Sequence, residues 1–95
     1  MMSGLPIDLN KVKTGDIDKE ILRIGMIAEL DAVNLYEQLA AKANKLEIKA
    51  LFLDIAREEK THIAEFETML LKLDKQQIEE NKKGKKEVED LLKDL

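Results

Sequence analysis

The stretch LDIAREEKTHIAEF, residues 53–66, places Glu59 and the one histidine of the chain, His62, three positions apart within an apolar helical pattern. Residues three apart are neighbours on a helix surface, so the carboxylate and the imidazole can act together. At about 100° per residue, the other side chains within roughly 60° of Glu59 are all apolar. They are Phe52, Ile55, Ala56, Ile63, Phe66 and Leu70. Both polar residues are therefore predicted to point into an apolar stripe.

A second stretch, IAELDAVNLYEQLA at residues 27–40, repeats this arrangement around Glu29. By the same angular rule, its face holds apolar residues, Gly25 and Tyr36, but no other charge. A carboxylate moved from water into such a stripe costs several kcal/mol unless it is paired, protonated or bound to a cation. The nearby basic residues Arg23, Arg57, Lys42 and Lys60 project elsewhere.

A divalent metal ion is the economical partner for Glu29, Glu59 and His62. Oxygen-rich ligands with one imidazole suit iron or manganese better than a tetrahedral structural zinc. One Glu and one Glu-x-x-His form half of the ligand set of the di-iron carboxylate bundles, which take a Glu from each of two helices and a Glu-x-x-His from each of two others. A two-fold dimer of this chain would supply the whole set.

Composition excludes several classes of site and partner. The chain has 95 residues and a formal charge of −4, which favours one small domain. With no cysteine, disulfides, zinc–thiolate sites, iron–sulfur clusters and thiol nucleophiles are excluded. No apolar run approaches the roughly 20 residues of a membrane span, and the N-terminus does not resemble a signal peptide, so a cytoplasmic location is expected. The lysines are spread among glutamates, which argues against a nucleic-acid partner.

The pattern predicts an all-α chain in three parts. Residues 1–15 hold the one proline and two of the four glycines and are expected to form an extended arm. A helical hairpin follows over residues 16–74, with Asp16 capping a helix to about residue 43 and Asn44 opening a second helix through a capping box. Asp74 and Gln77 give a similar capping cue just before and within residues 75–95, and the helical pattern is expected to break around residues 81–84. A short C-terminal helix or a mobile tail is therefore predicted.

Each long helix would span about 40 Å, and two such rods make a poor core. A hairpin alone leaves its apolar stripes half covered, so a second copy, or another partner, is expected to complete a four-helix bundle. Packing and ligand counting thus predict the same dimer.

The two quoted stretches together resemble the encapsulated ferritins, short two-helix members of the ferritin-like superfamily associated with encapsulin shells. The resemblance covers roughly residues 17–74, and its specific part is Glu29, Tyr36, Glu59 and His62. It implies a ferroxidase centre across a dimer interface, a ring-shaped decamer of five dimers, and delivery of oxidised iron into an encapsulin nanocompartment. Glu29, Glu59 and His62 would be iron ligands, and Tyr36 a close neighbour counted with the catalytic residues.

The chain also departs from that family. Ala28 precedes the first ligand glutamate, where some members have an acidic residue, so Asp31 alone would retain a secondary metal role. Leu35 stands where the family has tryptophan. The segment VEDLLKDL does not resemble a shell-targeting peptide. Association with a shell would therefore depend on fusion to a shell domain, or it would be absent.

Alternatives stay open at this point. Tyr36 has either a packing role or a redox or gating role, and Asp31, Glu58 and Glu65 are either solvated charges or contacts for a secondary ion. The expected function is a ferroxidase that oxidises Fe²⁺ to Fe³⁺ with dioxygen and supports iron storage. The competing functions are a non-enzymatic helical assembly or adaptor module, whose inward polar residues fix helix register, and a dimanganese or zinc protein of the same fold.

Overall fold

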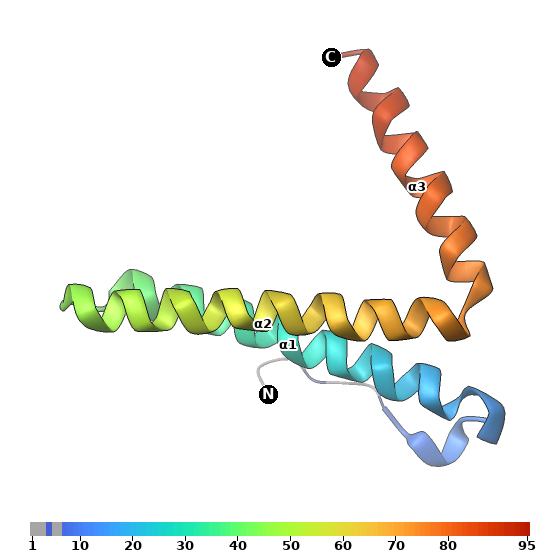
Figure 1. The fold of residues 1–95 in the computed structure, drawn as a ribbon, viewed down its shortest axis with the longest axis horizontal. Helices are drawn as coiled ribbons and strands as arrows, with labels where there is room; N and C mark the ends of the chain where they lie inside the picture. The colour runs from blue at the N-terminus through green and yellow to red at the C-terminus, as the bar shows by residue number, and fades with distance from the viewer. Residues whose placement is uncertain (1–3, 5–6) are drawn as a thin grey trace.

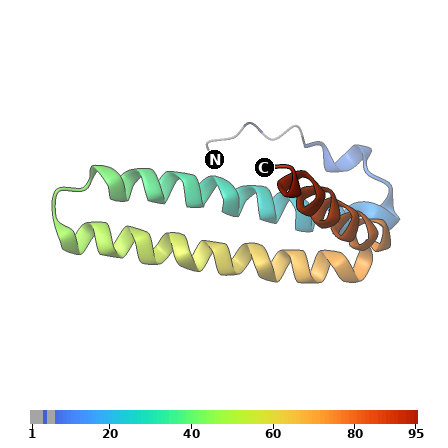
Figure 2. The ribbon, with the colours of Figure 1, turned by 90° about the horizontal axis from the view of Figure 1, so that it is seen from above.

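The computed structural model describes residue 4 and residues 7–95. Three α-helices occur in this part of the chain: α1 (Ile17–Lys42), α2 (Leu46–Leu73) and α3 (Lys75–Lys93). Two 3₁₀ turns, η1 (Leu9–Lys11) and η2 (Thr14–Asp16), precede them. Helices α1 and α2 run antiparallel side by side, and α3 leaves the end of this hairpin and projects away from it (Figures 1 and 2). The predicted all-α hairpin with a C-terminal helix is confirmed.

The extended arm predicted for residues 1–15 can be compared with the structure only in part. Residues 1–3 and 5–6 of that arm lie outside the described residues. Within the described portion, η1 and η2 add short helical turns to an otherwise irregular backbone. The domain division at residues 15 and 74 stays a prediction.

Helix α1 begins at the predicted residue, although its expected cap hydrogen bond is absent. Asp16 occupies the N-cap position, but its side chain makes no cap hydrogen bond and instead lies 3.7 Å from Lys19 Nζ. The carboxylates of Asp18 and Glu20 in the first turn interact favourably with the helix dipole. Start and length thus follow the sequence pattern, whereas the proposed capping contact is wrong.

The capping box predicted at Asn44 is also wrong. Helix α2 begins at Leu46, and its N-cap is Lys45, with no side-chain cap hydrogen bond. Ala43 and Lys45 both have extended backbone angles, so the turn between the helices uses the residue that was expected to cap α2. The Lys45 carbonyl accepts hydrogen bonds from the backbone N–H groups of Ile48 and Lys49 and starts the helix without Asn44.

The cue at Asp74 works as predicted, but the break expected after it does not occur. Asp74 Oδ1 accepts a hydrogen bond of 3.0 Å from the Gln77 backbone N–H and caps α3. The helix then runs without interruption through Gly84, because a glycine costs only about 1 kcal/mol in a helix interior. Side-chain pairs four residues apart, Gln77–Asn81 and Lys86–Asp90, support its surface.

The core of the single chain is thin. Its buried apolar residues are Val33, Ala40, Ala56 and Leu70, all from the hairpin, and none of the described large side chains is fully buried. The Cα radius of gyration is 16.9 Å, against about 12 Å for a compact chain of this length. The hairpin therefore positions its inward residues while leaving much of its apolar surface in water.

Candidate metal centre

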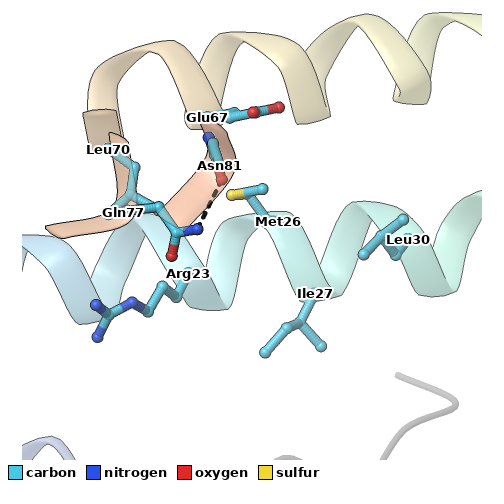
Figure 3. Close-up of a pocket in the computed structure, with 8 residues that line it drawn as sticks. All are labelled: Arg23, Met26, Ile27, Leu30, Glu67, Leu70, Gln77 and Asn81. Atoms are coloured by element: carbon cyan, nitrogen blue, oxygen red, sulfur yellow. Dashed lines mark hydrogen bonds between the residues drawn. The ribbon is translucent and has the colours of Figure 1, made fainter. Parts of the chain in front are cut away.

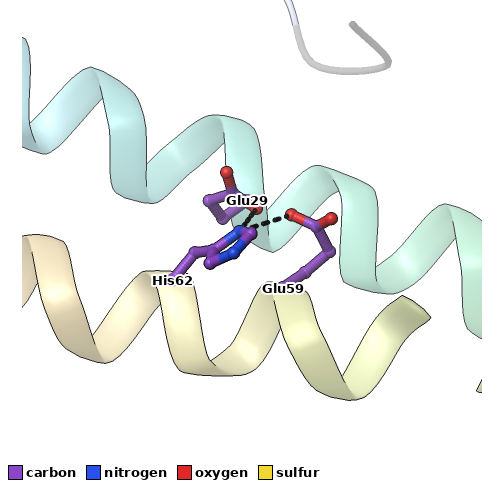
Figure 4. A group of neighbouring side chains, drawn as sticks. All are labelled: Glu29, Glu59 and His62. Carbon is purple, nitrogen blue, oxygen red and sulfur yellow. Dashed lines mark ion pairs between the residues drawn. The ribbon is translucent and has the colours of Figure 1, made fainter. Parts of the chain in front are cut away.

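Glu29, Glu59 and His62 converge near the middle of the hairpin (Figure 4). Glu59 and His62 are neighbours on α2, and Glu29 faces them from α1. One ligand atom from each residue can be chosen so that all three lie within 4.8 Å of one another. The structure thus brings together the three residues that the sequence marks as metal ligands.

The imidazole lies between the two carboxylates. His62 Nδ1 is 3.5 Å from Glu29 Oε2 and 3.4 Å from Glu59 Oε2. Two atoms bound to one first-row metal ion at about 2.1 Å, with an angle near that of a tetrahedron, lie about 3.4 Å apart. The observed spacings therefore fit ligands that share one ion.

Burial makes the carboxylates costly without a cation. The side chains of Glu29 and Glu59 are 20% and 18% exposed, whereas that of His62 is 45% exposed. Glu29 Oε2 is buried and accepts no hydrogen bond within the described part of the chain. Its polar neighbour is His62 Nδ1 at 3.5 Å, which makes no hydrogen bond to it, so the desolvation penalty of this oxygen is at most partly offset. A bound metal cation would satisfy it, so the donor set fits a metal on chemical as well as geometric grounds.

Two of the basic side chains expected to project away from the site, Lys60 and Arg57, pair with other carboxylates. Lys60 Nζ lies 3.0 Å from Glu37 Oε2, and Arg57 pairs with Asp54 at 3.0 Å. The described ion pairs of Glu29 and Glu59 both go to His62. No lysine or arginine among them takes the place that a metal ion would fill.

Tyr36 lies outside the ligand group. Its ring contacts Phe52, with centroids 5.9 Å apart and planes inclined by 43°. Tyr36 follows Glu29 by seven residues and Phe52 precedes Glu59 by seven, so this aromatic pair lies about two helical turns from the ligands. The contact is a packing contact between α1 and α2 on one side of the site.

The acidic residues considered for a secondary ion do not join the ligand group within the described residues. Glu58 is exposed and lies 3.9 Å from Arg57, and Glu65 is also exposed. Asp31 is half-buried and already has an interaction of its own. A secondary metal role for these three residues stays a prediction.

Sequence reasoning missed a second polar contact, at the joint with α3. Arg23 Nη2 of α1 donates a hydrogen bond of 2.8 Å to Asp74 Oδ2, and the Asp74 side chain is only 11% exposed. These residues are 51 positions apart, and no local pattern links them. Beside this joint lies an open pocket of about 470 Å³ (Figure 3), lined by Arg23, Met26, Ile27, Leu30, Glu67, Leu70, Gln77 and Asn81. This pocket contains none of the three ligands.

None of the helices in the described part of the chain is long and apolar enough to cross a membrane.

Comparisons of the sequence and of the structure with known proteins point to the same group of relatives. The sequence profile of the rubrerythrin family matches residues 20–93. A ferritin-like–encapsulin shell fusion protein of Pyrococcus furiosus is 46% identical over 93 residues, which are 96% of this chain and 27% of that protein. The chain thus spans about a quarter of that relative's length. The crystal structure of an encapsulated ferritin domain from Pyrococcus furiosus matches with a TM-score of 0.82 and 45% identity, over 96% of this chain and 95% of the other.

Proposed function

The chain belongs to the rubrerythrin family of ferritin-like proteins, and from this premise we propose that it is a ferroxidase. It oxidises Fe²⁺ to Fe³⁺ with dioxygen at a di-iron site shared between two subunits. The observation that carries the proposal is the group of Glu29, Glu59 and His62, in which Glu29 Oε2 is buried without a hydrogen-bond donor.

Each ligand has a distinct task in this proposal. The carboxylates of Glu29 and Glu59 offset the positive charge of the metal, and the neutral imidazole of His62 adds a nitrogen ligand through Nδ1, the atom that faces both carboxylates. Bound iron would supply the one-electron chemistry with dioxygen. The apolar walls limit access of water to the carboxylates, which strengthens their attraction for a cation.

A second subunit is part of the proposal because one chain offers half of a di-iron ligand set. The surface around His62 supports it. Leu51, Met69 and Leu73 lie on the His62 side of α2, at offsets of 11, 7 and 11 residues that return to the same helix face. They are 55%, 51% and 46% exposed in the single chain. A partner hairpin on this row would bury them and bring its own Glu29, Glu59 and His62 to the site.

The cellular setting is proposed from the fused relative, whose name joins a ferritin-like part to an encapsulin shell. By analogy, this chain would act in the cytoplasm inside an encapsulin nanocompartment, as a decamer of five dimers that supports iron storage. A four-helix dimer has no cavity for mineral, so ferric iron would accumulate in the shell that surrounds it.

Metal stoichiometry and oxygen consumption test the function. Protein purified without chelator is loaded with Fe²⁺ under anaerobic conditions, desalted, and assayed for iron per chain, and air is then admitted while ferric absorbance and oxygen are followed. We expect one iron per chain and oxygen-dependent ferric absorbance. Absence of stoichiometric iron would favour an adaptor, and retention of manganese or zinc without oxygen consumption would favour a non-ferroxidase of the same fold.

A further inference from the structure

A close contact between α1 and α2 lies next to the ligands, where the Phe66 ring meets Gly25. A Cβ atom placed on Gly25 would lie 3.2 Å from Phe66 Cε2 and Cζ and 3.3 Å from Cδ2. The other three glycines of the chain, Gly4, Gly15 and Gly84, would meet nothing within 4 Å. Gly25 is therefore the one glycine whose missing side chain is used for packing.

The position of this contact relates it to the metal centre. Gly25 precedes Glu29 by four residues and Phe66 follows His62 by four, so each lies about one helical turn, roughly 6 Å, from a ligand on its own helix. The contact therefore joins the same two helices as the ligands, one layer away. The Tyr36–Phe52 pair is a further turn distant on the opposite side.

The separation of the two helices matters because the ligands come from both. Glu29 Oε2 and His62 Nδ1 lie 3.5 Å apart across the hairpin. Metal–ligand distances tolerate about 0.2 Å, whereas carbon atoms in ordinary contact are about 3.5–4.0 Å apart. A Cβ at 3.2 Å requires its neighbour to give way by a few tenths of an ångström. Where the helices rather than the ring take up that shift, it exceeds the tolerance of the ligand spacing.

We propose that Gly25 is a positioning residue for the metal centre: by lacking a side chain it lets Phe66 lie against α1 and holds α1 and α2 at the separation that brings Glu29 to Glu59 and His62. This inference rests on the proposed metal site and adds a residue that binds no metal itself. Glycine is unfavourable in a helix interior relative to alanine. Helix formation by α1 alone therefore gives no reason for a glycine at position 25.

Cobalt titration of Gly25→Ala, with Gly84→Ala as the matched control, tests the proposal. Both substitutions replace a glycine inside a helix by alanine, so both gain the same helix propensity, but only position 25 is crowded. The probe is Co²⁺ alone, because its visible d–d absorbance reports coordination geometry as well as affinity. We expect Gly25→Ala to weaken Co²⁺ binding by roughly ten- to a hundredfold, the range for groups that orient ligands, and to change the d–d spectrum. Gly84→Ala should match wild type.

A rescue variant separates positioning from folding. Phe66→Leu removes the Cε2 and Cζ atoms that the new Cβ would meet, so the double variant Gly25→Ala/Phe66→Leu should bind Co²⁺ more tightly than Gly25→Ala and recover the wild-type spectrum. If Gly25→Ala does not fold, a folded double variant with restored binding still supports the proposal.

Two results would overturn it while leaving the proposed function intact. One is wild-type affinity and spectrum in Gly25→Ala. The other is a double variant that is no better than Gly25→Ala, which would show that the contact with Phe66 is not the cause. Failure of the wild-type protein to bind Co²⁺ or Fe²⁺ would overturn the metal site itself and this inference with it.

Discussion

The α1–α2 hairpin and α3 are both amphipathic helical segments, yet they hold their apolar residues differently. Among the residues that the structure describes, all four buried apolar ones belong to the hairpin, whereas Val88 and Leu91 of α3 are 55% and 64% exposed. The three clustered candidate ligands also lie in the hairpin, and α3 is connected to α1 through the Arg23–Asp74 contact at its start. The comparison shows that inward carboxylates occur where two helices pack, so changes in the hairpin should affect chemistry and changes in α3 should not.

The largest expected difference is in iron oxidation. Glu29→Ala, Glu59→Ala and His62→Ala should each slow Fe²⁺ oxidation by roughly a hundredfold or more, because each removes a ligand, and loss of even an orienting partner costs ten- to a hundredfold. The matched control is Asp90→Ala in α3, where Asp90 pairs with Lys86 and Lys93. Initial rates measured with limiting iron give the comparison. Near-wild-type rates in any two of the three ligand variants would refute the assigned site.

Removing the charge of Glu29 should stabilise the metal-free fold, although it impairs iron oxidation. In chelator-treated protein, Glu29→Gln should raise the free energy of unfolding by about 1 kcal/mol, since it removes a charge whose buried oxygen has no hydrogen-bond donor. Glu87→Gln, on the exposed surface of α3, should change it little. Urea unfolding with and without Fe²⁺ measures both variants. A lower stability of the metal-free Glu29→Gln protein would show that the carboxylate is already compensated in the folded chain.

The joint between the two regions should respond to pH rather than to iron. The Gln77 backbone N–H bonded to the Asp74 carboxylate, together with the nearby Arg23 guanidinium, outweighs partial burial and holds the pKa of Asp74 below its usual 3.8. A lowered folded-state pKa means that ionised Asp74 stabilises the fold above pH 3.8 and loses this contribution as the pH falls through the lower folded value.

Asp74→Asn tests this contact because it removes the charge and keeps a side chain that caps helices well. We expect a lower melting temperature than wild type near neutral pH, a difference that shrinks below pH 3.8, and an unchanged rate of iron oxidation. A melting-temperature difference that stays constant through that range would contradict the assigned role of the charge.

The smallest effect is expected at Tyr36. Tyr36→Phe keeps the ring that packs against Phe52 and removes only a hydroxyl that is not proposed as a ligand. Iron stoichiometry should stay at one per chain. Co²⁺ affinity should change by less than about threefold, the deviation typical of sites that act independently of each other. Loss of both irons from the dimer of this variant would mean that the hydroxyl belongs to the ligand set.

Local patterns predicted those features that depend on residues close in sequence. The spacing of Glu59 and His62 and the angular position of Glu29 were sufficient to predict that these three side chains come together, because helical geometry fixes which side chains share a face. The start of α1 and the Asp74 cap were equally local. Asn44 shows the limit of this reasoning, since the backbone of the interhelical turn, rather than the capping motif, decides where α2 begins.

Features that depend on two distant segments could not be predicted. The Arg23–Asp74 hydrogen bond and the Gly25–Phe66 contact join residues 51 and 41 positions apart, and both follow from how α1 and α2 pack. The break expected at residues 81–84 was wrong for another reason. A single glycine among good helix formers does not outweigh the propensity of its neighbours, and α3 continues through it.

Metal-linked assembly tests the central claim most directly. If the iron site takes ligands from two chains, Fe²⁺ must favour association, by about 2.7 kcal/mol at a hundredfold excess over Kd. Native mass spectrometry of chelator-treated protein, titrated anaerobically with Fe²⁺, should show smaller species converting to an even-numbered oligomer with two irons per pair of chains. The conversion should be absent in Glu29→Ala and His62→Ala. Iron bound to single chains, with equal affinity for monomer and oligomer, would contradict the shared site.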